Sequence, residues 1–418
     1  MARPIEVTIE SLGGLGDGIA SLGGKPIFIP KSCVGDRLEV NIVQEKSDKF
    51  HGAISKVLSP GPTRQPAPCS HFEQCGGCTM QQLAPASYRE FKTRMLHGAL
   101  AQAGFPSPES SVLFLPPHTR RRVECKIHYD NGKVQLAFHA LRSHTPVIIS
   151  ECPVLHPELE ALIAPLGEAL SELPFAEQLF SVSLTKADSG IDLLLTFKKG
   201  DINALPNLDW LGKKLSLGRI SAQIPDSKPK ILSQLHPVEM QLGDYAITLP
   251  PGAFLQATAE GQTALVNAVM EATIGQSSAV DLFCGIGTYS FPLSRKMKTH
   301  AVEGEKDMVE AIRSAAARHG IKNLSSEQRD LMQFPLTAKE LNAYEAAILN
   351  PPRIGAKAQS EQLAKSSVGL VVMVSCNPAT FARDAAILKK SGFALTSAQG
   401  IDQFLWSQHL EIVAVFRR

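Results

Sequence analysis

The last part of the chain, from about residue 252 to 418, places the tightest limit on the fold. Short apolar segments alternate there with segments whose apolar residues recur at helical spacing. The strand-like segments are AVDLFC, THAVEG, EAAILN, GLVVMVSC and EIVAVF, and the helix-like segments include TALVNAVMEAT, KDMVEAIRSAAARHG and TFARDAAILKKSG. This alternation predicts a doubly wound, mostly parallel sheet. Such sheets bind ligands beyond the carboxyl ends of their strands, so residues that follow each strand are the first candidates for a site.

Two further domains are predicted ahead of this region. Residues 1–60 alternate short β-type runs with glycine-rich turns such as GGLGDG, which indicates a small antiparallel β-barrel. The following stretch mixes strands with a few helices, which indicates an α+β domain. Within it, residues 86–104 have helical spacing and end at a glycine, and Asn131-Gly132 is typical of a hairpin turn. We therefore expect a multi-domain protein divided at 1–60, 61–250 and 251–418.

Composition and charge indicate an ordinary globular protein and argue against a secreted or membrane-spanning one. A chain of 418 residues with 44% hydrophobic and 20% charged residues is an ordinary globular protein. The start, MARPIEVTIESLGG, lacks the apolar core of a signal peptide, and no apolar run is long enough to span a bilayer. We expect a cytoplasmic protein with no membrane association and no obligate protein partner. Because the net charge is only +2, an anionic partner would need a local basic patch, for which 118–128 and 416–418 are candidates.

Three of the eight cysteines form a tight cluster. Cys69, Cys75 and Cys78 have C-x5-C-x2-C spacing in a loop with two glycines. Thiols stay reduced in the cytosol, so metal or cluster ligation explains this spacing better than disulfides do. Structural zinc and an iron–sulfur cluster both suit thiolate ligands. We interpret Cys125 and Cys284 as packing residues because they lie in β-type patterns, and Cys33 as incidental.

Glycines and acidic residues stand at the ends of the first strands in the last domain, in a pattern that favours binding of a nucleoside. Gly285 and Gly287 in AVDLFCGIGTYSFPL let the backbone pass close to a ligand, and Asp281 precedes them. Glu303 ends the next strand, where it can bind ribose hydroxyls. Asp330 follows a third strand, where it can accept a hydrogen bond from an adenine amino group. A dinucleotide fingerprint would need a third glycine where Ser290 stands, so the pattern favours S-adenosylmethionine over NAD.

Two later strand ends also carry candidate site residues. EAAILNPPRIGA ends a strand at Asn350 and enters a rigid Pro-Pro-Arg loop. GLVVMVSCNP places Cys376 at the end of a buried strand, directly before an Asn-Pro turn. A thiol beside a methyl donor is a candidate nucleophile. An ordinary packing role is the competing interpretation for a lone strand cysteine.

Together, these motifs resemble the iron–sulfur-containing TrmA/RumA-type RNA (uracil-5-)-methyltransferase family. The resemblance covers essentially the whole chain, and residues 1–60 resemble its RNA-binding TRAM domain. It implies a Rossmann-like methyltransferase domain at 251–418, with S-adenosyl-L-methionine and a 4Fe-4S cluster as cofactors.

The resemblance also assigns roles to individual residues. Cys376 is similar to the family nucleophile, and Glu411 in HLE is similar to the base. The positions that match donor-contacting residues are Gln256 in FLQAT, Phe283, Thr288, Glu303, Asp330 and Asn350, and those that match the cluster ligands are Cys69, Cys75, Cys78 and Cys152. The family usually has Asp where this chain has Asn350, which keeps an acceptor oxygen but loses the charge.

The chemistry explains why a thiol and a carboxylate are needed. Uracil C5 is too weak a nucleophile to take a methyl group until a thiolate adds to C6. A carboxylate must then remove the C5 proton so that the thiol can leave. The target uracil must lie in a loop or be turned out of its stack. Family analogy favours 23S ribosomal RNA, while transfer RNA, a non-catalytic RNA-binding paralogue and a metal or redox protein are alternatives.

Overall fold

The structure is a computed structural model that describes residues 4–105, 110–225 and 227–418. The chain divides into two compact units. The first consists of the residues up to Met95 together with Phe138–Val147 and Phe404–His409. The second consists of Leu96–Ala137, Ile148–Gln403 and Leu410–Arg418.

The first unit contains a six-stranded sheet in the order β1-β5-β6-β4-β3-β2. Its strands are β1 (Ile5–Thr8), β2 (Ser11–Leu12), β3 (Gly18–Leu22), β4 (Lys25–Ile29), β5 (Arg37–Glu45) and β6 (Phe50–Ser59). Alternate apolar residues such as Val7, Ile27 and Leu38 pack into one small core. Neighbouring strands are antiparallel except for β4 and β6, which pair in parallel, so the expectation of purely antiparallel pairing is wrong there.

A mixed sheet follows in the order β10-β9-β8-β11-β12-β13-β14. Its strands are β8 (Arg122–Asp130), β9 (Lys133–His139), β10 (Pro146–Ile148), β11 (Leu179–Lys186), β12 (Ile191–Phe197), β13 (Arg219–Gln223) and β14 (Lys230–Gln234). Asn131 and Gly132 have φ angles of 49° and 78° and join β8 to β9, which confirms the predicted hairpin.

Short helices and one separate hairpin accompany this sheet. The helices are α2 (Pro157–Glu160), α3 (Ile163–Ser171), η1 (Ala176–Gln178), η2 (Ile202–Ala204) and α4 (Asp209–Lys214), and the hairpin strands are β15 (Glu239–Leu242) and β16 (Tyr245–Thr248). The helix predicted over 86–104 is confirmed as α1 (Pro85–Gln102), and Gly104 follows it with a φ of 82°.

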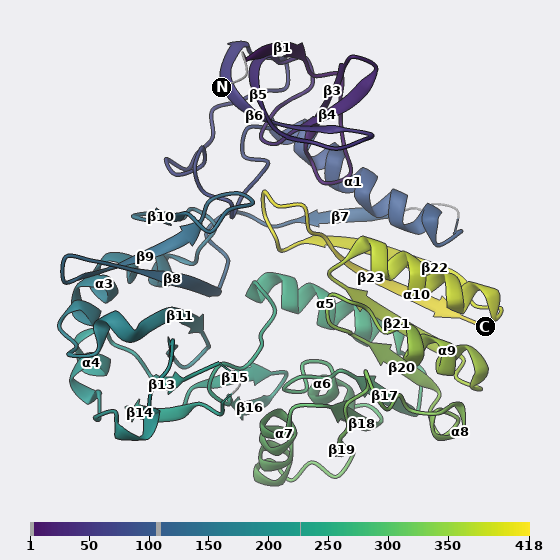
Figure 1. Cartoon of the computed structure of the whole chain (residues 1–418). Coiled ribbons are helices and arrows are strands. Elements are labelled where there is room, and N and C mark those ends of the chain that lie inside the picture. Colours follow the sequence, from purple (N-terminus) through teal and green to yellow (C-terminus); the bar gives the residue numbers. More distant parts are fainter. Residues whose placement is uncertain (1–3, 106–109, 226) are drawn as a thin grey trace. The chain divides into compact units, whose positions relative to one another are not determined.

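The eight-stranded sheet of the second unit has the order β19-β18-β17-β20-β21-β23-β22-β7 (Figure 1). Its strands are β7 (Ser111–Phe114), β17 (Ser278–Leu282), β18 (Lys298–Glu303), β19 (Leu324–Gln328), β20 (Ala346–Leu349), β21 (Leu370–Ser375), β22 (Ala394–Asp402) and β23 (Glu411–Arg417). The five strands from β19 to β21 are parallel, which confirms the predicted mostly parallel sheet. Strand β23 runs antiparallel to both of its neighbours.

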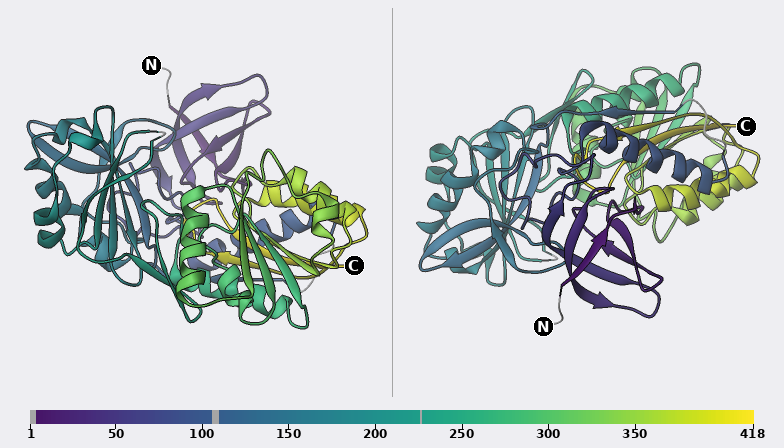
Figure 2. Two further views of the ribbon diagram at one scale, coloured as in Figure 1. Left: turned by 90° about the horizontal axis from the view of Figure 1, so that it is seen from below. Right: turned by 90° about the horizontal axis from the view of Figure 1, so that it is seen from above.

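Helices cover both faces of this sheet. They are α5 (Ala259–Ala272), α6 (Ser290–Ser294), α7 (Lys306–Arg318), α8 (Ala338–Leu341), α9 (Lys357–Lys365) and α10 (Pro378–Lys390). On β23, Val413 and Val415 pack in the same core as Leu265 of α5, whereas Phe416 meets Phe381 of α10. Successive strand residues point to opposite faces, so this alternation buries both faces of the strand. The helices α9 and α10 lie side by side in the yellow-green part of Figure 2.

Among the described residues, none of the helices combines enough length and hydropathy to cross a membrane.

Candidate active site

The parallel strands bring the predicted strand-end residues to one edge of the sheet. Because β17, β18, β19, β20 and β21 run in the same direction, their carboxyl ends meet there. The residues at or just beyond these ends are Phe283, Glu303, Asp330, Asn350 and Cys376. The sheet therefore gathers residues that are far apart in sequence.

The Asn-Pro turn after Cys376 connects two of these loops. Asn377 caps α10 by accepting a hydrogen bond from the backbone N–H of Ala379 at 3.1 Å, and Pro378 occupies the first helical turn. The Asn377 Nδ2 also donates to the backbone oxygen of Arg353 at 2.9 Å. The turn thus ends the strand and fixes the Pro-Pro-Arg loop beside the thiol.

The register of β21 and β23 places Cys376 next to Glu411. Ser375 pairs with Ile412 in this antiparallel ladder, so one more step brings Cys376 opposite Glu411. Cys376 is half-buried. Burial raises the pKa of its thiol to about 11, with a further contribution from the negative charge of Glu411, while Arg353 acts in the opposite direction. The thiol is therefore protonated at neutral pH.

Glu411 is a buried carboxyl group at the first position of β23. Its side chain accepts a hydrogen bond from Gln403 Nε2 at 2.8 Å. Burial raises the pKa of Glu411 to about 7, and the Gln403 bond opposes this shift. A carboxyl group with this pKa can take up a proton reversibly near neutral pH.

The loop after β17 has an unusual backbone. Phe283, Gly285 and Gly287 have positive φ angles of 61°, 56° and 86°. A left-handed conformation is rare for a bulky residue such as Phe283 and is found mostly at functional sites. A Cβ added to Gly285 would meet no atom within 4 Å, so the loop borders open space at this residue.

Glu303 holds the Gly285 loop in place. Its carboxylate accepts backbone hydrogen bonds from Gly285 at 2.9 Å, from Gly304 at 2.7 Å and from Glu305 at 3.0 Å. Three N–H donors fix the direction of this side chain at the end of β18. The sequence predicted that Glu303 stands at a strand end, but it did not indicate that this side chain holds the Gly285 loop.

Other strand-end residues have local polar contacts. Asp330 Oδ1 accepts from the backbone N–H of Met332 at 2.9 Å. Asp281 is fully buried and accepts from the Ser290 hydroxyl at 2.6 Å, and burial raises its pKa to about 7. Thr288 lies in the turn before α6, and the backbone N–H of Asn350 donates to Leu282 at 3.2 Å.

Comparisons with known proteins agree with this arrangement. The sequence model described as tRNA (Uracil-5-)-methyltransferase matches residues 88–418. The chain belongs to the tRNA (uracil-5-)-methyltransferase family. The predicted enzyme class, an S-adenosylmethionine-dependent RNA uracil-5-methyltransferase, is therefore confirmed.

Relatives match the methyltransferase over nearly its full length. An uncharacterized RNA methyltransferase of Brucella suis biovar 1 (strain 1330) is 37% identical over 422 residues, covering 99% of this chain and 98% of that protein. The 23S rRNA (uracil(1939)-C(5))-methyltransferase RlmD of Shewanella denitrificans is 30% identical over 451 residues, covering 100% and 96%. Pyrococcus abyssi tRNA (uracil-54, C5)-methyltransferase, solved with S-adenosyl-L-homocysteine, has a TM-score of 0.75 at 21% identity and covers 99% and 100%, which shows the shared fold.

Arg121 and Arg122, in the candidate basic patch 118–128, make hydrogen bonds inside the methyltransferase. Arg121 is only 4% exposed, and it donates to the backbone oxygen of Gln256 at 3.0 Å and to Gln262 at 2.7 Å. Arg122 donates to the backbone oxygen of Leu255 at 2.9 Å, and burial lowers the pKa of both arginines to about 10. These two side chains therefore hold the FLQAT segment, and the buried Arg121 is not part of an exposed basic patch.

The terminal patch at 416–418 is likewise occupied. Arg417 donates to the backbone oxygen of Ala272 at 2.6 Å. Arg418 donates to Val368 at 3.0 Å, and its guanidinium lies 4.3 Å from the centre of the Phe393 ring. These arginines pin the last strand to its neighbours.

In the first unit, the cysteine loop is arranged around Lys31. Its ammonium donates to the backbone oxygens of Phe72, Glu73 and Cys75, the last at 3.0 Å, and lies 4.8 Å from the centre of the Phe72 ring. Burial lowers the pKa of Lys31, while Glu73 and the thiols of Cys69, Cys75 and Cys78 act in the opposite direction. Three sulfur atoms are thus within electrostatic range of one cation, which the sequence did not indicate.

Within residues 4–105, 110–225 and 227–418, no group of three or more His, Cys, Asp or Glu side chains is arranged to hold a metal ion. Cys152 belongs to the second unit, where its backbone N–H donates to Glu160 at 2.8 Å. The iron–sulfur cluster and its zinc alternative remain predictions.

The other cysteines are buried packing residues. Cys33 and Cys125 are almost fully buried, and burial raises the pKa of each thiol to about 12. Cys284 is also buried, and its pKa is raised well above the usual value. Buried thiols of raised pKa behave as small packing residues, as was expected of Cys125 and Cys284, whereas the burial of Cys33 was not expected.

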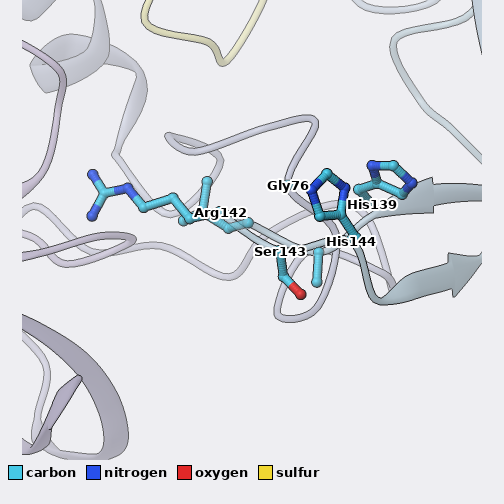
Figure 3. Close-up of a pocket in the computed structure, with 7 residues that line it drawn as sticks. Gly76, His139, Arg142, Ser143 and His144 are labelled. Atoms are coloured by element: carbon cyan, nitrogen blue, oxygen red, sulfur yellow. The ribbon is translucent and has the colours of Figure 1, made fainter. Parts of the chain in front are cut away.

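The first unit contains a surface cavity (Figure 3). Its volume is about 370 Å³, and it is lined by Gly76, His139, Ala140, Leu141, Arg142, Ser143 and His144. The His139 and His144 rings meet edge to face at 5.4 Å. Arg142 points away from them and pairs with Asp17 at 2.7 Å.

Proposed function

We propose that this methyltransferase forms 5-methyluridine in RNA, with 23S ribosomal RNA as the preferred substrate. The observation that carries the proposal is the β21–β23 register, which sets the thiol of Cys376 opposite the buried carboxyl group of Glu411. Uracil C5 methylation needs this pair of groups at one place. A cytoplasmic location belongs to the same proposal, because that is where the predicted substrate is found.

In this proposal, Cys376 is the nucleophile. Its sulfur bonds to uracil C6 as the thiol proton leaves to solvent, and the electrons of the C5–C6 double bond move toward C5 and O4. Arg353 opposes the rise in the pKa of Cys376 and so favours the thiolate needed for this step. Asn377 holds the main chain of Arg353 through its backbone oxygen.

Glu411 acts after methylation as the base. It removes the proton from C5, the electron pair restores the C5–C6 double bond, and the C6–sulfur bond breaks to return Cys376 as a thiolate. With its pKa near 7, Glu411 is ionised in a useful fraction of molecules at neutral pH and can release the proton afterwards.

The residues at the sheet edge fit a nucleoside-type methyl donor. Open space at Gly285, the left-handed Phe283 and the acids at the ends of β18 and β19 form a suitable cradle. S-adenosylmethionine supplies an electrophilic methyl group when bound. The residues proposed to hold it are Gln256, Phe283, Thr288, Glu303, Asp330 and Asn350.

Substrate choice rests on the relatives. The RlmD protein, whose name gives a 23S rRNA uracil, is 30% identical over essentially the whole chain, whereas the archaeal tRNA enzyme is 21% identical. The higher identity supports ribosomal RNA, and transfer RNA is the second candidate. The retained Cys376 and Glu411 argue against a non-catalytic RNA-binding paralogue.

The test of this proposal is methyl transfer from labelled S-adenosylmethionine to purified RNAs. We expect the protein to label unmodified 23S ribosomal RNA at a single-stranded uridine, and mass spectrometry of the digest to give 5-methyluridine. Efficient labelling of tRNA transcripts, with none of 23S RNA, would move the substrate to transfer RNA. A methylated base other than uracil would overturn the proposed chemistry.

We propose further that Cys69, Cys75, Cys78 and Cys152 bind a 4Fe-4S cluster. Thiolate donors suit iron–sulfur clusters, and the Lys31 ammonium would stabilise the negative charge of such ligands. The backbone N–H of Gly77 also points to Cys75 Sγ at 3.3 Å, a kind of contact that tunes ligating sulfurs. Binding would gather the ligands and order the loop without a role in methyl transfer.

Anaerobic purification distinguishes iron from zinc. We expect a brown protein with broad absorbance near 400 nm and about four iron atoms per chain, as a 4Fe-4S centre requires. Cys75→Ser should lose the colour, while Cys33→Ser serves as the control and should keep it. A colourless protein that contains about one zinc would replace the cluster with a structural zinc site.

A further inference from the structure

Gln403 lies at the centre of a buried hydrogen-bond network behind Glu411. It directly follows β22 and is 2% exposed. Its Nε2 donates to Glu411 Oε2 and to Gln256 Oε1, both at 2.8 Å. Its Oε1 accepts from the backbone N–H of Ala257 at 3.1 Å.

This set of contacts allows one orientation of the Gln403 amide. A backbone N–H can only donate, so the atom that meets Ala257 must be the Gln403 oxygen. The Gln403 nitrogen then faces Glu411 and Gln256 and uses both of its hydrogens. The usual ambiguity between the two ends of an amide is therefore resolved by the network.

The fixed amide in turn orients Gln256. Because Gln256 Oε1 accepts from Gln403, the amino end of Gln256 must point away from Gln403. The main chain of Gln256 is held by Arg121, which donates to its oxygen at 3.0 Å. Both the backbone and the side-chain direction of Gln256 are thus set by neighbouring residues.

The local packing leaves room for Gln403 only because glycine occupies position 261. A Cβ there would lie 2.9 Å from Gln403 Oε1 and 3.1 Å from its Cβ. Gly261 is in the first turn of α5, where Thr258 caps the helix. The helix start is therefore shaped around this glutamine.

We propose that Gln403 is a positioning residue that holds one oxygen of Glu411 and leaves the other oxygen free for the C5 proton, while turning the amino group of Gln256 away from Gln403. This inference rests on the proposed role of Glu411 as the base. The Gln403 amide donates a hydrogen bond that favours the ionised form of the buried carboxylate. Because the amide is neutral, it brings no positive charge next to Glu411. A cationic partner would lower the pKa of Glu411 strongly and weaken it as a base.

Two other titratable groups face Glu411. The Cys376 thiol lies opposite it at the end of β21, and the Tyr289 hydroxyl lies before α6. Both are neutral at pH 7, because burial raises the pKa of Cys376 to about 11 and the pKa of Tyr289 well above its usual value. Asp281, whose pKa burial also raises to about 7, acts on the same Tyr289 but hydrogen-bonds to Ser290, so the Glu411→Gln background is needed to assign a change of rate near pH 7 to Glu411.

The experiment measures decay of the methylated covalent adduct in single-turnover reactions from pH 5.5 to 9. The main variant is Gln403→Met, which keeps the length but removes both donors. Loss of the hydrogen bond raises the pKa of Glu411, so we expect the acid limb of the decay profile to move up by about one pH unit. At pH 7, decay should slow about fivefold, because the ionised fraction of Glu411 falls from about one half to about one tenth, with recovery toward pH 9.

The controls separate this proposal from a folding defect and from failure of the proposed function. Gln399→Met, on the same strand, should keep the wild-type profile. In a Glu411→Gln background, Gln403→Met should leave the pH profile unchanged. Should Gln403→Met fail to fold, Gln403→Glu keeps the shape and replaces a donor with an acid, which should move the limb further in the same direction.

Several results would overturn the inference. A decay profile of Gln403→Met that overlays that of the wild type, or one lowered equally at all pH values, shows that Gln403 does not position the base. The same holds if the shift persists without the carboxylate of Glu411. If the wild-type protein forms no adduct at all, the proposed methylation mechanism fails before Gln403 is tested.

Discussion

Replacement of Cys376 by alanine is expected to abolish 5-methyluridine formation. Cys284, in the loop after β17, is not expected to substitute for it, because it is buried and its pKa is raised well above the usual value. Loss of a covalent nucleophile typically costs about 10⁴-fold or more in rate. Methyl transfer to RNA under single-turnover conditions measures this loss, and RNA that carries 5-fluorouridine should give a gel-stable adduct with the wild type but not with Cys376→Ala.

The matched control is Cys125→Ala, which removes a buried thiol from β8. This variant should retain the adduct and lose only some stability, since a buried cysteine behaves as a small hydrophobe. An adduct of normal yield with Cys376→Ala would remove this sulfur from the mechanism. Binding of RNA by Cys376→Ala should remain, because no basic group is changed.

Replacement of Glu411 by glutamine is expected to separate methylation from product release. The amide keeps the shape and can still meet Gln403, but it cannot accept the C5 proton. We therefore expect Glu411→Gln to transfer a methyl group and then accumulate as a protein–RNA adduct, with turnover reduced about 10²-fold to 10⁴-fold. Quantitative gel electrophoresis of adduct against time measures the stall.

At acid pH the wild type should also accumulate protein–RNA adduct, although less than Glu411→Gln does. Because the pKa of Glu411 is about 7, its basic form is present above that pH and is lost as the pH falls through it. Adduct should thus decay more slowly at pH 6 than at pH 8. Glu310→Gln, on the exposed surface of α7, is the control and should keep the wild-type rate. Full turnover by Glu411→Gln would show that another group takes the proton.

The sequence predicted the parallel sheet well because its signals are local. Each buried strand is a short apolar run, and each is followed by a helix with regular spacing, so the carboxyl edge could be located without a structure. The placement of Cys376, Glu303 and Asp330 at strand ends follows from the same pattern. Their roles in the reaction remain predictions, since position alone does not show what a side chain contacts.

The network around Gln403 could not be found in this way. Its members, Gln256, Gln403 and Glu411, meet only because β22 and β23 form a hairpin beside the FLQAT segment. A lone glutamine after a strand carries no distinctive sequence signal. The same limit explains Arg121, because a triplet of arginines looks like a surface patch until the backbone oxygens that it binds are known.

Strand β7 also has a consequence for attempts to dissect the protein. It pairs with β22 although Ser111 and Gln399 are far apart in the chain, and it forms one edge of the sheet. A fragment that begins at residue 251 would leave the backbone groups of β22 open to pairing with a second molecule. Such a fragment would be prone to self-association, and a protease cut between β7 and α5 would be tolerated only while the two pieces stayed together.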